Sequence, residues 1–126
     1  MKSNIIDIAA GLICNSDKHR HISFIIYKNR IVSIGYSQAR KTDPMAKRYG
    51  HRFSSIHSEL HSIKKFPFRP SKLAKCMMVN IRIMANGSIG ISKPCENCQK
   101  LLIDFGLKAV YYTNRKGDLV RWQMHL

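Results

Sequence analysis

This sequence is organised around His57-Ser58-Glu59 and around Pro94-Cys95-Glu96-Asn97-Cys98, which follows later in the chain. One imidazole and two thiolates supply three ligands to a tetrahedral zinc ion and leave its fourth position open, as in catalytic rather than structural zinc sites. A proline at the start of a helix, followed by thiols three residues apart, places both sulfurs on the first helical turn. There the positive end of the helix favours thiolate over thiol. The sequence therefore predicts a zinc site made of His57, Cys95 and Cys98.

Glu59 lies two residues after His57, so on a long helix the two side chains would face different sides. Both can serve one metal only from the first turn of a helix, with the ion near its end. Glu59 is then close to the water on the metal without being a ligand. Zinc lowers the pKa of such a water to about 7, and a neighbouring carboxylate can take its proton and pass it to a leaving amine. We therefore predict that Glu59 is the catalytic acid/base.

The order H-x-E and then P-C-x-x-C resembles the signature of the zinc-dependent cytidine deaminase superfamily. The match covers both motifs and, more loosely, the order of elements from about Ile22 to the C-terminus. The resemblance implies a three-layer α/β fold of the cytidine deaminase type, with a mixed five-stranded sheet flanked by helices. It also implies one Zn²⁺ per chain and hydrolytic deamination. The alternatives are a zinc knuckle or two unrelated pieces of a core.

A chain of 126 residues is long enough for one domain, and we expect residues 1–126 to form it. No apolar run approaches the roughly 20 residues of a membrane span, and the N-terminal residues lack the layout of a signal peptide. We therefore expect a cytoplasmic protein in a reducing compartment, with no membrane partner. Cys14 and Cys76 are then best interpreted as buried thiols, with a disulfide between them as the alternative.

The charge is strongly positive: 22 Lys and Arg against 7 Asp and Glu give a net charge of +15. Solubility alone does not require so much charge of one sign, whereas a polyanionic partner does. The alternative is a solvated surface in a generally basic proteome. The charge bears on which partners the protein meets and says nothing about the chemistry that it performs.

Hydrophobic periodicity and turn residues predict the elements. Ser3 can cap a first helix, Asn29 suits the turn of a first hairpin, and Ser54 or Ser55 can cap a helix that stops before Pro67. The stretch 39–55 is predicted to be irregular, and 66–71 to be a loop. The predicted helices are 3–14, the one containing His57, and 95–105, which Gly106 closes. The predicted strands are 22–27, 31–36, 76–85 (central), 107–113 and 119–123, with 89–92 as a short extended piece.

The last two predicted strands indicate which branch of the superfamily this sequence resembles. Asn114–Asp118 is a five-residue connection, too short for a parallel crossover, so the last two strands should be antiparallel. That topology is similar to the branch of free cytidine deaminases and several toxin deaminases. It differs from tRNA adenosine deaminases and deoxycytidylate deaminases, in which a helix separates these strands. Because both this ending and the P-C-E-N-C version of the motif differ from the tRNA adenosine deaminase pattern, cytosine is the expected base.

Substrate contacts are predicted from the same resemblance. Nucleoside deaminases tend to have G-x-N close to the position of Gly35, with the asparagine on a ribose hydroxyl. Here Ser37 stands in place of the asparagine and Gln38 follows it, and either could contact the sugar. Backbone N–H groups of Ser58 and Cys95 could donate to the substrate, and the Lys93 carbonyl could meet the exocyclic amine.

Phosphate contacts are predicted from charge. The loop before His57 contains five cations that could hold phosphate oxygens: Arg40, Lys41, Lys47, Arg48 and Arg52. Arg82, inside the central strand, could pair with Asp7 or Asp104, or could contact a phosphate or a ring carbonyl.

The resulting expectation is a zinc-dependent hydrolase that converts cytosine to uracil in a phosphorylated nucleotide or in single-stranded DNA or RNA. The alternatives are a deaminase of free cytidine or deoxycytidine in pyrimidine salvage, and a non-catalytic basic nucleic-acid-binding zinc module. Assembly into a homo-oligomer would be in keeping with the superfamily.

Overall fold

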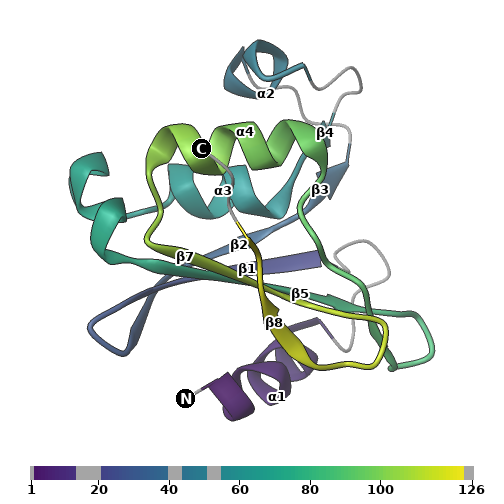
Figure 1. Cartoon of the computed structure of the whole chain (residues 1–126). Helices are drawn as coiled ribbons and strands as arrows, with labels where there is room; N and C mark the ends of the chain where they lie inside the picture. The colour runs from purple at the N-terminus through teal and green to yellow at the C-terminus, as the bar shows by residue number, and fades with distance from the viewer. Residues whose placement is uncertain (1, 14–20, 40–43, 51–54, 124–126) are drawn as a thin grey trace.

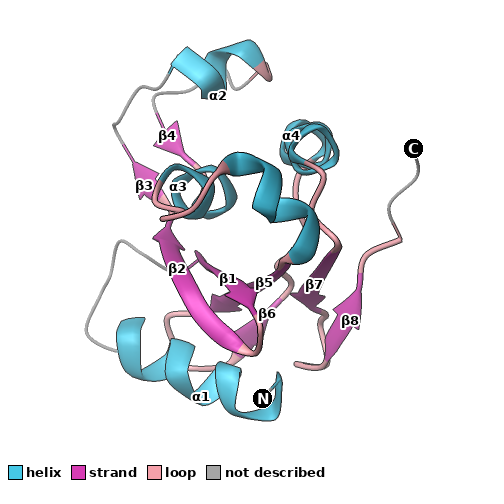
Figure 2. Ribbon diagram, turned by 90° about the vertical axis from the view of Figure 1, so that its left-hand side faces the viewer, coloured by secondary structure: helices cyan, strands magenta, loops and turns pink. Residues whose placement is uncertain are grey.

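The computed structural model describes residues 2–13, 21–39, 44–50 and 55–123. They form three layers, with a mixed β-sheet between helix α1 (Lys2–Ile13) on one face and helices α3 (Ser58–Lys64) and α4 (Glu96–Phe105) on the other (Figure 1). Figure 2 shows α3 and α4 side by side above the sheet and α1 below it. The predicted three-layer fold is confirmed, and the two helices that carry the motif residues share one face.

The sheet consists of β1 (His21–Tyr27), β2 (Arg30–Tyr36), β5 (Met77–Ile83), β7 (Ala109–Thr113) and β8 (Leu119–Arg121), in the order β2-β1-β5-β7-β8. The short strand β6 (Ile89–Gly90) pairs with β5 and makes a sixth, in addition to the five predicted. β5 and β7 are parallel, and their neighbours in this order pair antiparallel. In particular, β7 and β8 are antiparallel, as the short connection between them requires.

Two hydrophobic clusters cover the two faces of the sheet, because alternate side chains of a strand point to opposite faces. Ile25 and Met78 pack with α3 and α4, whereas Phe24 and Ile81 pack with α1. Both faces are buried, which explains the nearly continuous apolar sequence of β1 and β5. A polar residue inside either strand is therefore buried and needs a partner.

The turn of the β1–β2 hairpin consists of Lys28 and Asn29, both with positive φ (51° and 63°), as type I′ turns require. Asn114 organises the β7–β8 turn, because its Oδ1 accepts from the backbone N–H groups of Lys116 and Asp118. Both predicted hairpins are confirmed.

The segment between β2 and α3 is more ordered than predicted. Its described part contains β3 (Gln38–Ala39), α2 (Pro44–Arg48) and β4 (Ser55–Ile56), and β3 pairs with β4 in a second small sheet. Because Ser55 lies in β4, His57 is the N-cap of α3, and the prediction of a serine cap is wrong.

Two other predicted boundaries also change. Residues Pro70–Lys75, predicted in part as a loop, form the 3₁₀ helix η1, and α1 already includes Ser3, the predicted cap. None of the described helices has the length and apolar character needed to cross a membrane.

Candidate active site

The three predicted zinc ligands come from the first turns of α3 and α4. His57 is the N-cap of α3, Cys95 is the N-cap of α4, and Cys98 lies one turn into α4. The backbone N–H of Cys98 points to Sγ of Cys95 at 3.5 Å. Gln99 Nε2 donates to the carbonyl of Pro94 at 2.8 Å, which fixes the approach to the helix. The ligands are thus placed by two helix starts that lie next to each other.

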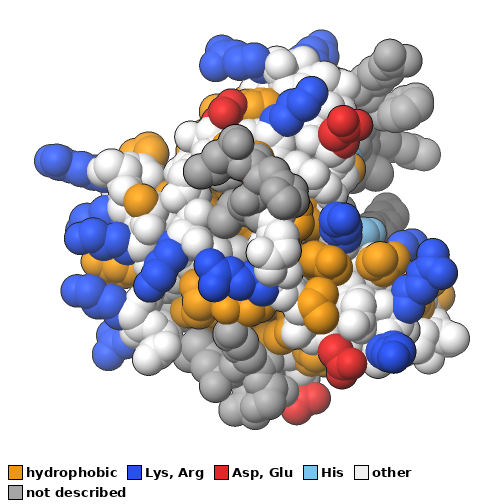
Figure 3. Space-filling model, viewed as in Figure 1, with side chains coloured by type: hydrophobic (Ala, Val, Ile, Leu, Met, Phe, Trp, Pro, Cys, Tyr) orange, Lys and Arg blue, Asp and Glu red, His pale blue; other side chains and the backbone are white. Residues whose placement is uncertain are grey.

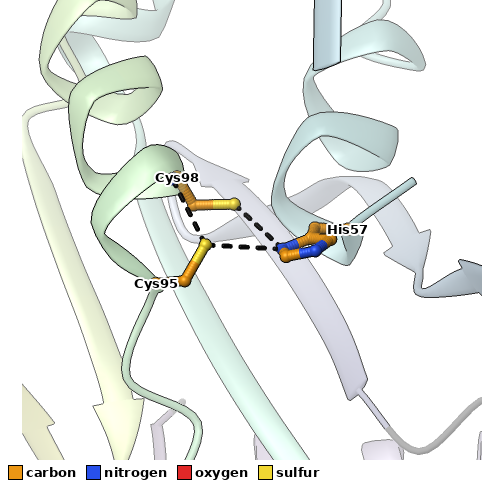
Figure 4. A group of neighbouring side chains, drawn as sticks. All are labelled: His57, Cys95 and Cys98. Carbon is orange, nitrogen blue, oxygen red and sulfur yellow. Dashed lines mark hydrogen bonds between the residues drawn. The ribbon is translucent and has the colours of Figure 1, made fainter. Parts of the chain in front are cut away.

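The ligand atoms of His57, Cys95 and Cys98 all lie within 4.8 Å of one another (Figure 4). Nδ1 of His57 is 3.6 Å from Sγ of Cys95 and 3.3 Å from Sγ of Cys98. Tetrahedral zinc, with Zn–S of about 2.3 Å and Zn–N of about 2.0–2.1 Å, requires N to S separations of about 3.6 Å. The group fits zinc in donor type and in spacing, and Cys95 leaves it open to solvent on one side. Among the described residues no fourth His, Cys, Asp or Glu joins it.

Contacts among the ligand residues raise pKa values in the metal-free protein. The hydrogen bond with Cys95, and then burial, raise the pKa of the Cys98 thiol. The hydrogen bond with Cys95 also raises the pKa of His57 against the opposing effect of burial. Protons would therefore compete with a zinc ion for these ligand atoms, so that metal binding and proton release are coupled.

We call His57, Cys95 and Cys98 the metal group. Glu59 lies close to the metal group and is buried, with 7% of its surface exposed. Its carboxylate belongs to a ring of four side chains from α3, β1 and β5. Ser58 Oγ lies 3.2 Å from Glu59 Oε1, and Asn80 Nδ2 donates to Glu59 Oε2 at 3.4 Å. Ser23 Oγ closes the ring, 2.7 Å from Ser58 Oγ and 2.6 Å from Asn80 Oδ1.

Burial has the largest effect on the Glu59 carboxyl and raises its pKa. The nearby His57 and the hydrogen bond from Ser58 to Oε1 act in the opposite direction. The net result is a buried carboxyl whose pKa lies above its usual value.

Ser23 and Asn80 were not predicted as part of the site. Each is a polar residue inside an otherwise apolar strand. Both lie at opposite positions on the adjacent strands β1 and β5, where their side chains share a face. A search for buried polar residues that need partners would have selected them.

The segment before Cys95 is attached to the sheet by hydrogen bonds. Ser92 Oγ donates to the carbonyl of Asn80 at 2.6 Å and accepts from the backbone N–H of Thr113 at 2.7 Å. The backbone N–H of Ser92 donates to the carbonyl of Thr113 at 2.9 Å. β5 and β7 therefore hold the chain directly ahead of the metal ligands.

The residues predicted to contact the substrate lie in segments that adjoin the metal group. The backbone of Gln38 pairs with Ile56, which directly precedes His57, and Ser37 is half-buried with its N–H bonded to the carbonyl of His21 at 3.1 Å. The Ser58 hydroxyl is turned inward to Ser23, whereas the contact predicted for Ser58 involves its backbone N–H. Lys93 is exposed in the segment that leads to α4. Their contacts with a substrate remain predictions.

Of the predicted phosphate-binding residues, Lys47 and Arg48 are exposed on the last turn of α2. Arg40, Lys41 and Arg52 lie outside the described residues. Tyr49, which follows α2, donates to Asp104 of α4 at 2.7 Å, and this hydrogen bond is the main cause that raises the pKa of Tyr49.

His21 and Arg82 occupy opposite positions on β1 and β5, next to Ser23 and Asn80. Because alternate side chains share a face, both project toward α3 and α4. Burial, followed by the charges of Arg82 and His57, lowers the pKa of His21 to about 4. Nε of Arg82 is buried and has no hydrogen-bond partner among the described residues. His61, in contrast, is a helix-face residue, as predicted, whose Nδ1 accepts from the N–H of Tyr36.

Comparisons with known proteins agree with the architecture. No family model and no curated protein sequence matches the chain. Among solved structures, the chain is similar to the crystal structure of cytidine deaminase from Burkholderia pseudomallei, with a TM-score of 0.63 and 14% sequence identity. The alignment covers 98% of this chain and 93% of that one. The chain therefore has the cytidine deaminase-like fold.

Proposed function

We propose that this protein is a zinc-dependent hydrolytic deaminase that converts cytosine to uracil, in a phosphorylated nucleotide or in single-stranded nucleic acid. The observation that carries the proposal is the convergence of His57, Cys95 and Cys98 above the buried carboxyl of Glu59. The fold supports it, because the similar solved structure is a cytidine deaminase.

In this reaction water adds to the ring carbon that bears the amine, and ammonia leaves as that carbon becomes a carbonyl. A zinc ion held by His57, Cys95 and Cys98 would supply a water that is nucleophilic at neutral pH. Glu59 takes one proton from the attacking water and gives it to the ring nitrogen. It then takes the second proton from the same oxygen, now bonded to the ring carbon, and gives it to the leaving amine. A carboxyl with a raised pKa suits this task, since it must both accept and donate near neutral pH.

The preference for a phosphorylated substrate is supported by the charges around the site. Arg82, whose buried Nε has no hydrogen-bond partner among the described residues, lies on the face of the sheet that packs against α3, and Lys47, Arg48 and Lys93 are exposed. The competing proposal, a deaminase of free cytidine, is supported by the antiparallel β7 and β8 and by the similar solved structure.

The test is release of ammonia and uracil from cytidine, deoxycytidine, their monophosphates, and single-stranded DNA and RNA. The protein is loaded with zinc and its metal content is measured. We expect one zinc per chain and turnover that Glu59→Gln lowers by a factor of about 10²–10⁴, with unchanged zinc content. Full zinc occupancy without ammonia from any of these compounds would refute the proposal. Faster turnover of cytidine than of its phosphorylated forms would favour the salvage alternative.

A further inference from the structure

A second basic surface lies away from the metal group, at the other end of α3. A surface cavity of about 490 Å³ opens there between the β1–β2 hairpin and the starts of β5 and β7, lined in part by Tyr27, Lys28, Lys75 and Lys108. Phe68 and Lys72, from the segment that includes η1, extend it. We call these six residues the lysine–aromatic surface.

Two aromatic rings lie next to each other on this surface, each with an ammonium group near it. Phe68 is 41% exposed, and the centre of its ring lies 5.7 Å from that of Tyr27. Nζ of Lys28 stands 5.2 Å from the ring centre of Tyr27, and Nζ of Lys72 stands 5.3 Å from that of Phe68. Lysine stems are flexible, so both ammonium groups can turn to a phosphate and leave the ring faces to a base.

The segments that form most of this surface contain no acidic residues that could neutralise its lysines. No Asp or Glu occurs between Leu60 and Pro94, nor in the hairpin turn. Figure 3 shows Lys and Arg side chains gathered along its left-hand edge, where Figure 1 draws η1 and the hairpin turn. The described lysines of this surface are exposed and are therefore available to a partner.

We propose that the lysine–aromatic surface binds single-stranded nucleic acid. Proteins that bind single strands combine cations that follow the phosphates with aromatic side chains on which bases stack. A base pair inside a duplex cannot stack on Phe68, so the rings select single strands, whereas the lysines attract any polyanion.

This inference adds to the proposed function a surface that would bind the strand. It rests on the proposed function only where it takes the bound strand to be the substrate. α3 and α4 begin at the metal group and run toward the lysine–aromatic surface (Figure 1). α4 has 10 residues and is about 15 Å long. A strand of several nucleotides can contact both places, whereas a free nucleoside cannot. The binding itself requires neither zinc nor catalysis.

The test measures binding of fluorescent single-stranded DNA and RNA oligonucleotides to the Glu59→Ala protein by anisotropy at several salt concentrations. One variant replaces Lys28, Lys75 and Lys108 by Gln. Its matched control replaces Arg115, Lys116 and Arg121 by Gln, three exposed residues near the β7–β8 turn, and lowers the net charge equally. We expect the surface variant to lose about 10-fold or more in affinity and the slope of log affinity against log salt to fall by up to about 2. The control should lose little.

A second pair of variants tests stacking. Phe68→Ala should weaken binding of single strands about 10-fold and leave duplex binding unchanged. Leu12→Ala, which shortens another exposed apolar side chain on the far helix α1, should change neither. Equal losses in the two charge variants, or equal effects of Phe68→Ala on single strands and duplex, would refute the inference. Because catalysis is not measured, these results stand whether or not the protein proves to be a deaminase.

Discussion

Ser23 does not touch the metal group, yet it closes the ring of side chains that holds Glu59. Ser23→Ala removes both of its contacts and leaves Asn80 Oδ1 and the Ser58 hydroxyl short of a partner. A buried polar group without its partner costs about 1–3 kcal/mol, and Glu59 loses its fixed position. We expect kcat to fall about 10-fold with little change in KM, as for an interaction that acts on the proton-transferring group.

The control is Ser33→Ala, another buried serine. Its hydroxyl donates to the carbonyl of Ser62 on α3 at 2.6 Å and has no contact with Glu59. Urea unfolding should show that Ser33→Ala lowers the free energy of unfolding about as much as Ser23→Ala does, while kcat stays nearly unchanged. Equal losses of kcat in the two variants would mean that the ring matters only for packing.

His21 should make folding sensitive to acid. Burial lowers its pKa to about 4, from 6.5 in the unfolded chain, so the unfolded state binds the proton more tightly. The stability that a neutral His21 provides is complete above pH 6.5 and is lost as the pH falls toward 4. By pH 5 the loss is about 2 kcal/mol. Between pH 7.5 and pH 5, the free energy of unfolding of the metal-free wild-type protein should therefore fall by about 2 kcal/mol more than that of His21→Gln.

The measurement is urea unfolding of both proteins in the presence of a chelator. Glu59 and His57 titrate in both proteins, so the difference between the two curves reports the effect of His21, including its interaction with His57. Parallel curves from pH 7.5 to pH 5 would show that His21 is not held neutral.

At the scale of elements, a glycine in β2 allows α3 to lie directly against the sheet. A Cβ on Gly35 of β2 would collide with the backbone of Ser58 and Ser62. Since the clash is with backbone, α3 must move, and with it His57 and Glu59. We expect Gly35→Ala to cost at least the about 1–3 kcal/mol typical of overpacking and to weaken zinc binding.

Gly11 provides the matched control, because a Cβ on this residue of α1 meets no atom within 4 Å. Gly11→Ala in a helix should stabilise by about 0.5–1 kcal/mol and leave zinc affinity unchanged. Thermal unfolding and a zinc competition assay compare the two. Normal zinc affinity in Gly35→Ala would contradict the idea that the fit of α3 on β2 positions the metal group.

The same elements show which features of the fold could be predicted from the sequence and which could not. The β1–β2 and β7–β8 hairpins and the end of α4 at Gly106 follow from local rules, because their turn residues act within a few positions. The start of α3 does not. Ser54 and Ser55 are good capping residues, but pairing of Ser55 with Ala39 in the small sheet moves the cap to His57. The candidate metal ligands could be predicted from the spacing of their motifs, whereas Ser23 joins the ring around Glu59 only through contacts across strands.

For the whole molecule, zinc would connect two helices that are far apart in the sequence. His57 starts α3, and Cys95 and Cys98 belong to α4, so a metal bound only by the folded protein must stabilise it. Zinc at 100 times its Kd contributes about 2.7 kcal/mol, which for a chain of this length raises Tm by about 10 °C.

Thermal unfolding with zinc and with a chelator measures this shift. Cys98→Ser should remove most of it, whereas Cys76→Ser should retain it, because Cys76 is buried beside η1, outside the metal group. The shift should also shrink as the pH falls, since the protons held on His57 and Cys98 compete with zinc. A shift of the same size in Cys98→Ser would place the stabilising metal elsewhere in the chain. Retention of the full shift at low pH would show instead that these protons are not displaced when zinc binds.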